Sequence, residues 1–176
     1  RLEYYLSDIT FHSSNGIVYR DKKAYYVNAL DSIIKDLVID SIPYGNYSSI
    51  SFNIGLPPEM NISYFLPNTL ENINMAWPDA MGGGYHFLKL EGKVTTPAGP
   101  MGYAMHLGNN ISLVNVNAPL SLRIQHPVNT LFATMNINEW FRNPNTYNFS
   151  KDGNYTMGIM PAMKKLSENG KDVFTH

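Results

Sequence analysis

The sequence predicts an all-β domain, an antiparallel β-sandwich with long loops and one short C-terminal helix. Three observations support this prediction: apolar and polar residues alternate in many short runs, turn signals separate these runs, and helical periodicity is scarce. The chain has 176 residues, of which 44% are hydrophobic and 12% are aromatic. This length and composition are typical of one globular domain, which we expect to span residues 1–176.

The N-terminal part of the sequence contains clear strand patterns. Residues 2–6 alternate in one phase and residues 9–11 in the other, so we expect one strand with a bulge near Ser7 and Asp8. The dipeptide Asn15-Gly16 is a good hairpin turn. Further strands are expected at residues 17–19, 24–27, 33–39 and 47–54.

The centre of the sequence predicts a long connection followed by a β-hairpin. Residues 55–80 contain several prolines and no clear period, and long connections of this kind are usually functional. The alternating runs 84–91 and 101–107 flank a turn-forming segment, residues 95–100. The triple glycine, residues 82–84, is expected to be a bend that lets the backbone pass close to another group.

The C-terminal part predicts short strands and then a helix. Pro161 at the first position and Asn169-Gly170 at the end predict a helix over residues 161–168. Strands are expected at residues 111–116, 120–124 and 130–137, a helical turn at 138–141, and loop at 142–158.

Two histidines stand in the two strands of the predicted central hairpin. If the hairpin closes around position 96, His86 and His106 lie directly opposite each other, with Cβ atoms about 5 Å apart. Two imidazoles at that distance can share Cu, Zn, Fe or Ni, whereas a slip of one residue would send them to opposite faces. Nearby methionine sulfurs would favour Cu(I). The alternative is that the histidines are packed in the fold and the methionines only fill the core.

Composition excludes several other classes of function. Only 15% of residues are charged and the net charge is −1, so nucleic acid and anionic lipid are not expected partners. Cysteine is absent, and no apolar run approaches the ~18 residues of a membrane-spanning helix. Hydrolase and phosphate-binding motifs are also missing, so we do not expect an enzyme.

Low charge with abundant Asn, Tyr and Gly is typical of exported proteins. Asn-x-Ser/Thr sequons occur at Asn46, Asn61, Asn110, Asn148 and Asn154.

Segments along nearly the whole chain resemble one known family. The matching segments are RLEYYLSDI from Arg1, YGNYSSISFNIG from Tyr44, MAW from Met75, GYHFLKLEG from Gly84, HLG from His106 and NGKDVF from Asn169. The chain resembles the MbnP family, copper-associated exported proteins related to the surface copper proteins of methane-oxidising bacteria. This resemblance implies an antiparallel β-sandwich, located in the periplasm or at the cell surface and often carrying a lipid anchor. It also implies one or two strands before residue 1, so that the chain is N-terminally incomplete.

The resemblance further implies a copper site. In the family, two histidines bind copper, as Cu(I) or Cu(II), and in some members a tryptophan oxidised to kynurenine by a dihaem peroxidase-like partner adds a nitrogen ligand. By position, Trp77 matches the modifiable tryptophan and His106 matches the histidine of the second strand. Copper-binding relatives place an aromatic residue or a histidine two positions after the tryptophan, where this chain has Asp79. His86 is therefore the candidate for the second histidine. Secondary candidates are Asp79, Met81 and Met105.

A second hypothesis is a metal-free β-sandwich that serves as an interaction subunit of an outer-membrane or cell-surface assembly. A missing N-terminal strand would expose a sheet edge with which a partner can pair. The central histidines would then be structural. The two hypotheses differ in whether purified protein carries a metal or a modified Trp77.

Overall fold

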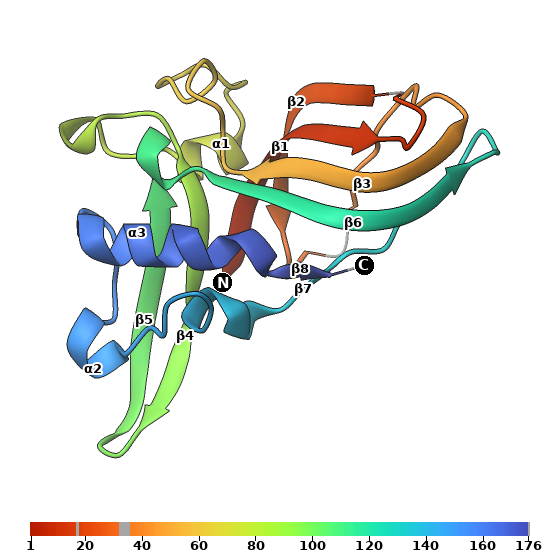
Figure 1. Ribbon diagram of the computed structural model, residues 1–176. Coiled ribbons are helices and arrows are strands. Elements are labelled where there is room, and N and C mark those ends of the chain that lie inside the picture. The colour runs from red at the N-terminus through yellow and green to blue at the C-terminus, as the bar shows by residue number, and fades with distance from the viewer. Residues whose placement is uncertain (17, 32–35, 176) are drawn as a thin grey trace.

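A computed structural model describes residues 1–16, 18–31 and 36–175, and confirms the predicted antiparallel all-β fold (Figure 1). Within these ranges, six strands form one sheet in the order β5-β4-β1-β3-β6, with β2 paired to β1, and two short strands form a separate β7–β8 pair. The strands are β1 (Leu2–His12), β2 (Val18–Asn28), β3 (Gly45–Ile54), β4 (His86–Thr96), β5 (Gly99–Gly108), β6 (Val114–Ile124), β7 (Thr134–Met135) and β8 (Phe174–Thr175).

β1 is the strand that joins the two halves of the large sheet. Its first residues pair with β4, its later residues pair with β3, and β2 runs along its other edge. The β4–β5 and β3–β6 pairs therefore form two wings, which run in clearly different directions (Figure 1). The predicted bulge in β1 is confirmed: the register shifts between Ser7 and Ile9, and Asp8 has a φ of 55°. The Arg20 guanidinium holds the Asp8 carboxylate at this bend.

The predicted C-terminal helix is confirmed as α3 (Met160–Asn169), with Pro161 in its first turn and Gly170 at its C-cap. Its buried face places Ala162, Met163 and Leu166 against the main core. Two single-turn helices lie in segments predicted as loops: α1 (Leu70–Asn74), capped by Thr69, and α2 (Phe149–Asp152), capped by Asn148. Short 3-10 turns are η1 (Asp79–Met81), η2 (Asn110–Ser112), η3 (Ile137–Phe141) and η4 (Gly170–Asp172).

Four strand predictions need correction. The predicted strands 17–19 and 24–27 belong, from residue 18 on, to one continuous strand, β2. Residues 33–35 of the predicted 33–39 strand lie outside the described ranges, and residues 36–39 have no strand pairing. The predicted strands 111–116 and 120–124 belong to one continuous strand, β6, because Ala118 and Pro119 continue the pairing with β3. Residues 111–112 form part of the turn η2 instead, so the strand begins only at Val114. Of the predicted strand 130–137, only β7 forms. Phe132 just before it is 82% exposed, so its side chain has no core to support a longer strand.

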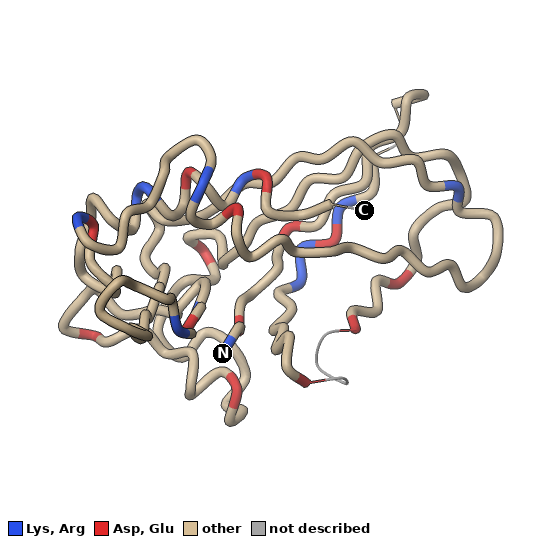
Figure 2. Tube along the Cα trace, turned by 90° about the horizontal axis from the view of Figure 1, so that it is seen from below, with Lys and Arg blue, Asp and Glu red and all other residues tan. Residues whose placement is uncertain are grey.

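Two clusters of apolar side chains form the core. The main cluster lies between the sheet and the segment formed by α3, η3 and the β7–β8 pair, and includes the fully buried Trp140, Phe87 and Leu166. A smaller cluster on the β3–β6 wing contains Ile9, Phe11, Tyr47, Leu120 and Ile124. No helix within the described ranges is long and apolar enough to cross a membrane. Figure 2 shows Lys and Arg interspersed with Asp and Glu along the described trace.

Several sequon asparagines have structural roles. The Asn61 amide donates to the Asn110 side chain (2.9 Å), and the Asn154 amide donates to the carbonyl of Gly102 (2.8 Å). Asn148 caps α2 by accepting from the Ser150 amide (3.0 Å). Hydrogen bonds within the fold therefore give these asparagines a structural role.

Candidate metal centre

The β4–β5 hairpin brings His86 and His106 together by a different route from the predicted one. The hairpin turns at Pro97 and Ala98, so His106 lies opposite Lys89, and His86 lies opposite Gly108. The prediction that the two histidines lie directly opposite each other is therefore wrong. A bulge between His86 and Leu88 adds one residue to β4. Since Gly108 and His106 are two residues apart on β5, they share a face, and the bulge keeps His86 and Lys89 on that face too.

The rings of the two histidines are in contact with each other and with Trp77. The centroids of His86 and His106 are 5.1 Å apart, with an angle of 82° between the planes. The Trp77 ring lies edge-on to His86 at a centroid distance of 4.7 Å. Gly108 makes room for the indole, because a Cβ at this position would lie only 2.2 Å from Trp77 Cε3. Side chains from β4, from β5 and from the segment before β4 therefore form one cluster.

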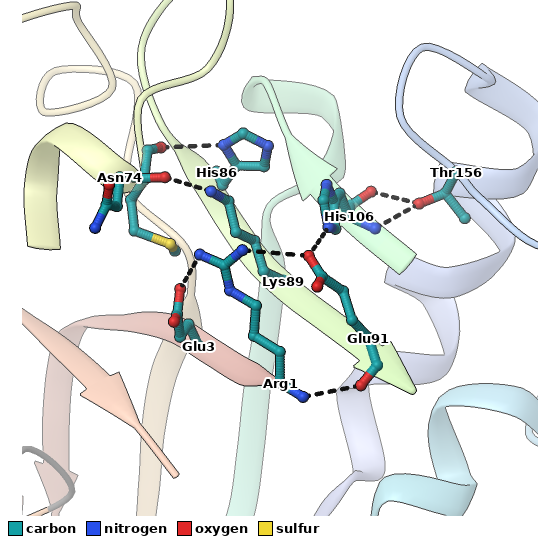
Figure 3. Close-up of polar contacts among 9 residues, drawn as sticks. Arg1, Glu3, Asn74, His86, Lys89, Glu91, His106 and Thr156 are labelled. Carbon is teal, nitrogen blue, oxygen red and sulfur yellow. Dashed lines mark hydrogen bonds and ion pairs between the residues drawn. The ribbon is translucent and has the colours of Figure 1, made fainter. Parts of the chain in front are cut away.

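One nitrogen of each imidazole is held by an acceptor from the protein (Figure 3). His86 Nδ1 lies 3.2 Å from the carbonyl oxygen of Met75, and His106 Nε2 lies 2.9 Å from Glu91 Oε1. Carbonyl oxygens and ionised carboxylates only accept, so both imidazoles are assigned as donors at these positions. The second nitrogen of each ring, His86 Nε2 and His106 Nδ1, then carries a lone pair. Thr156 fixes the backbone of His106 through two hydrogen bonds, of 2.7 and 2.6 Å.

Burial keeps both histidines neutral. His86 is 5% exposed, and burial lowers its pKa to about 3, with the charge of Lys89 and the neighbouring His106 adding to the effect. Burial also lowers the pKa of His106, although its hydrogen bond to Glu91 acts in the opposite direction. Neutral imidazole is the form that binds metal ions.

The charged groups beside the pair are themselves paired. The Lys89 ammonium donates to the carbonyl of Asn74, and burial lowers its pKa. Arg1 connects Glu3, at 2.8 Å, to Glu91, at 3.4 Å (Figure 3). The Glu91 carboxylate therefore accepts from both His106 and Arg1, which fixes its position under the ring.

The other candidate residues lie at different distances from this cluster. Trp77 Nε1 donates to the carbonyl of Met81 (3.2 Å), and an unmodified indole offers no lone pair to a metal. The Met81 side chain is 37% exposed, and its methyl group lies against Gly158. Asp79 is exposed and accepts from Ser63 (3.0 Å). Met105 is fully buried, and it lies opposite Leu90 on the other face of β5 from His106. The structure therefore does not bring Asp79 or Met105 to the histidine pair.

Few side-chain atoms at the histidine pair could bind a metal ion. Across residues 1–16, 18–31 and 36–175, no group of three or more His, Asp or Glu side chains is arranged to hold a metal ion. The cluster thus offers two imidazole nitrogens, with Trp77 beside them, and the neighbouring Glu91 carboxylate is engaged on the other nitrogen of His106.

The sequence did not reveal the groups that support the histidines. Glu91 lies in the same strand as His86 and Lys89. Because it follows Lys89 by two residues, strand alternation places both side chains on one face, and this signal could have identified Glu91 as a neighbour of the histidines. The carbonyl of Met75 and the hydroxyl of Thr156 come from segments without a recognisable motif.

The predicted bend at the triple glycine is confirmed. Residues 82–84 all have positive φ, between 67° and 108°, and Gly84 passes so close to Asn61 that a Cβ would lie 2.3 Å from Asn61 Oδ1. Hydrogen bonds from Gly84 N to Ser63 and from Tyr85 N to Asn61, both 2.9 Å, fix this contact.

Comparison with known proteins identifies one family. A family model, MbnP, matches residues 1–161 of the 176-residue chain. Neither curated proteins nor solved structures gave a match.

Proposed function

We propose that this chain, which belongs to the MbnP family, is an exported copper-binding protein without catalytic activity, in which His86 and His106 hold the ion. Family membership supports an association with copper. The observation that carries the site assignment is the pair of neutral imidazoles in contact, each with one nitrogen fixed by a carbonyl or carboxylate. Metal-binding histidines almost always donate their other ring N–H to such an acceptor.

The burial and the charge around the two histidines favour Cu(I). Imidazole nitrogens suit copper, whereas Mg²⁺, Ca²⁺ and Mn²⁺ prefer carboxylate and carbonyl oxygens. The nearest such oxygens here, on Glu91 and Met75, already accept from the histidines. The site is buried, Lys89 contributes a positive charge nearby, and the one carboxylate beside it, Glu91, is shared between His106 and Arg1. An ion of lower charge costs less free energy to desolvate in such surroundings. We therefore propose that the monovalent ion is the preferred form.

We further propose that Trp77 completes the site after oxidation to kynurenine, as the family resemblance implies. The indole lies 4.7 Å from His86 between ring centroids, so a product of its oxidation would remain beside the histidines. The oxidant would come from a dihaem peroxidase-like partner in the periplasm or at the cell surface, where a lipid anchor would hold the chain. The absence of cysteine is compatible with an oxidising compartment.

Copper binding by single-site variants tests the assignment. We expect His86→Ala and His106→Ala each to weaken Cu(I) binding, measured anaerobically against a competing chelator, by more than about 100-fold. His12→Ala is the matched control, because His12 contacts Ser51 (2.8 Å) in β3, on the other wing. Circular dichroism checks that each variant folds. Stoichiometric binding of unchanged affinity in both site variants would contradict the proposal.

Mass spectrometry and elemental analysis of protein from its natural source test the role of Trp77. Copper together with a modified Trp77 peptide supports the three-residue site. Copper with unmodified Trp77 limits the ligands to the two histidines. Absence of both metal and modification would favour the metal-free interaction subunit instead.

A further inference from the structure

A hollow lies beside α1, away from the histidine pair. Its volume is about 390 Å³, and it is bounded by the β1–β2 hairpin on one side and by the segment 66–72 on the other. Its main lining residues are Tyr5, Tyr26, Leu66, Pro67, Glu71 and Asn72. The hollow therefore combines two aromatic rings, a carboxylate and a side-chain amide.

The walls of the hollow are fixed by hydrogen bonds. The Tyr5 hydroxyl donates to Asn72 Oδ1 (2.7 Å), and Asn72 Nδ2 donates to the carbonyl of Pro67 (2.8 Å). The amide of Leu66 donates to the hydroxyl of Tyr85 (2.9 Å). The rings of Tyr5 and Tyr26 meet edge to face, with centroids 6.0 Å apart. A ligand would enter a pre-organised site, which reduces the entropic cost of binding.

The lining of the hollow contains one acidic residue, Glu71, and no Lys or Arg. Residues 36–88 contain five Asp or Glu residues and no Lys or Arg. Burial raises the pKa of Tyr26 to about 12, and the charges of Glu3 and Glu71 add to this rise, which places the Glu71 charge near the ring. Arg1 acts in the opposite direction on Tyr26, but it is paired with Glu3 and Glu91. Within the described ranges, the Tyr26 hydroxyl makes no hydrogen bond.

Exposed apolar side chains stand on the segment that forms one wall of the hollow and on the loop just before it. Tyr64 is 90% exposed and Leu70 75% exposed, and Ile62, Phe65 and Ile73 are each more than half exposed. The loop is held in place because Asn61 and Ser63 bind the glycine bend, and Tyr64 itself has a φ of 66°. Exposed apolar residues that lie next to polar groups are typical of protein interaction sites.

We propose that this hollow binds an arginine or lysine side chain of a partner protein, whose neighbouring apolar residues pack on Tyr64, Phe65 and Leu70. The half-buried ring of Tyr26 lines the hollow and can contact the cation, while Glu71 supplies the counter-charge. The Tyr26 hydroxyl, which has no hydrogen-bond partner among the described residues, can accept a hydrogen bond. Two copies that met through this hollow would place one Glu71 against the other, and the Glu71 carboxylate would also repel an anionic membrane. The inference goes beyond copper binding and does not depend on it.

A peptide pair tests the proposal on the full chain. The probe is acetyl-Leu-Arg-Leu-amide, and its uncharged counterpart carries citrulline in place of arginine. We expect the arginine peptide to shift the NMR amide signals of Leu66, Glu71 and Asn72, and to bind about tenfold more tightly than the citrulline peptide. Glu71→Gln should abolish this difference. Glu59→Gln, a change of the same charge in the same acidic segment but outside the hollow, should preserve it.

Copper stoichiometry is measured in the same samples and should be unchanged by Glu71→Gln. This separates failure of the hollow from failure of the copper site. Equal affinity for the two peptides, shifts confined to other surfaces, or no saturable binding in the millimolar range would each overturn the proposal.

Discussion

The histidine pair and the hollow beside α1 both depend on the connection between β3 and β4, but they are built for different kinds of cation. The histidine pair is buried, its ligand nitrogens are neutral, and its charged neighbours are already paired. The hollow is open to solvent and contains a carboxylate, Glu71, that forms no ion pair among the described residues and lies beside two rings. A desolvated metal ion suits the first region, and a hydrated organic cation suits the second. Burial, more than residue type, separates the two functions.

The largest expected effect comes from filling the space that Trp77 occupies. Gly108→Ala would place a Cβ 2.2 Å from Trp77 Cε3, so we expect a loss of about 2–3 kcal/mol in the free energy of unfolding and weaker copper binding. Urea denaturation measures the first effect. The control is Gly102→Ala on the same strand, where the nearest atom is 3.9 Å away and a change within about 0.5 kcal/mol is expected. Equal losses in the two variants would show that the buried region tolerates added volume.

A smaller effect should follow from removing the acceptor below His106. Glu91→Gln replaces the carboxylate that holds His106 Nε2, and we expect copper affinity to fall by about tenfold, or ~1.4 kcal/mol. Chelator competition measures this change. The arginine peptide should bind the hollow as before. If Glu91→Gln alters peptide binding but not copper affinity, the two regions are not independent as proposed.

The pH dependence of stability should also differ between the histidine pair and the hollow. The folded-state pKa of His86, about 3, lies below its ordinary value of 6.5, so the unfolded chain binds more protons between these values. Stability of the metal-free protein is therefore retained above pH 6.5 and falls as the pH decreases, by about 1 kcal/mol per pH unit. Urea denaturation at pH 7.5, 6.5 and 5.5 should show this slope, and His86→Gln should reduce it. The hollow adds nothing in this window, because the lowered pKa of Glu71 acts below pH 4.5. An equally steep slope in His86→Gln would assign the effect to another group.

Sequence patterns predicted the elements better than the contacts between them. The bulge at Asp8 was visible because the phase of apolar residues changes there, and α3 was visible from Pro161 and Gly170. The bulge at Phe87 gave no such signal, because residues 85–90 are all buried and show no alternation. The predicted register of the two histidines therefore failed, although their association did not.

The groups that complete each region come from distant parts of the chain. Thr156 lies 50 residues from His106, and Asn72 lies 67 residues from Tyr5. Neither pair belongs to a motif, and a single sequence contains no information on such separations. The hollow in particular could be recognised only after the packing of α1 against β1 and β2 was known.

The tip of the β4–β5 hairpin, far from the histidines, is a suitable site for attaching a label or a tether. Consecutive pairs from Leu88 with Leu107 to Thr96 with Gly99 connect the histidine region to the tip, which extends away from the body of the molecule (Figure 1). At ~3.3 Å per residue, Thr96 lies roughly 30 Å along the strand from His86. The ladder and the bulge hold the histidines in register, so an attachment at the turn that keeps Thr96 paired with Gly99 leaves the histidines in place. A fluorophore or a surface tether placed between Pro97 and Ala98 would therefore report on the loaded protein without disturbing the ion that it carries.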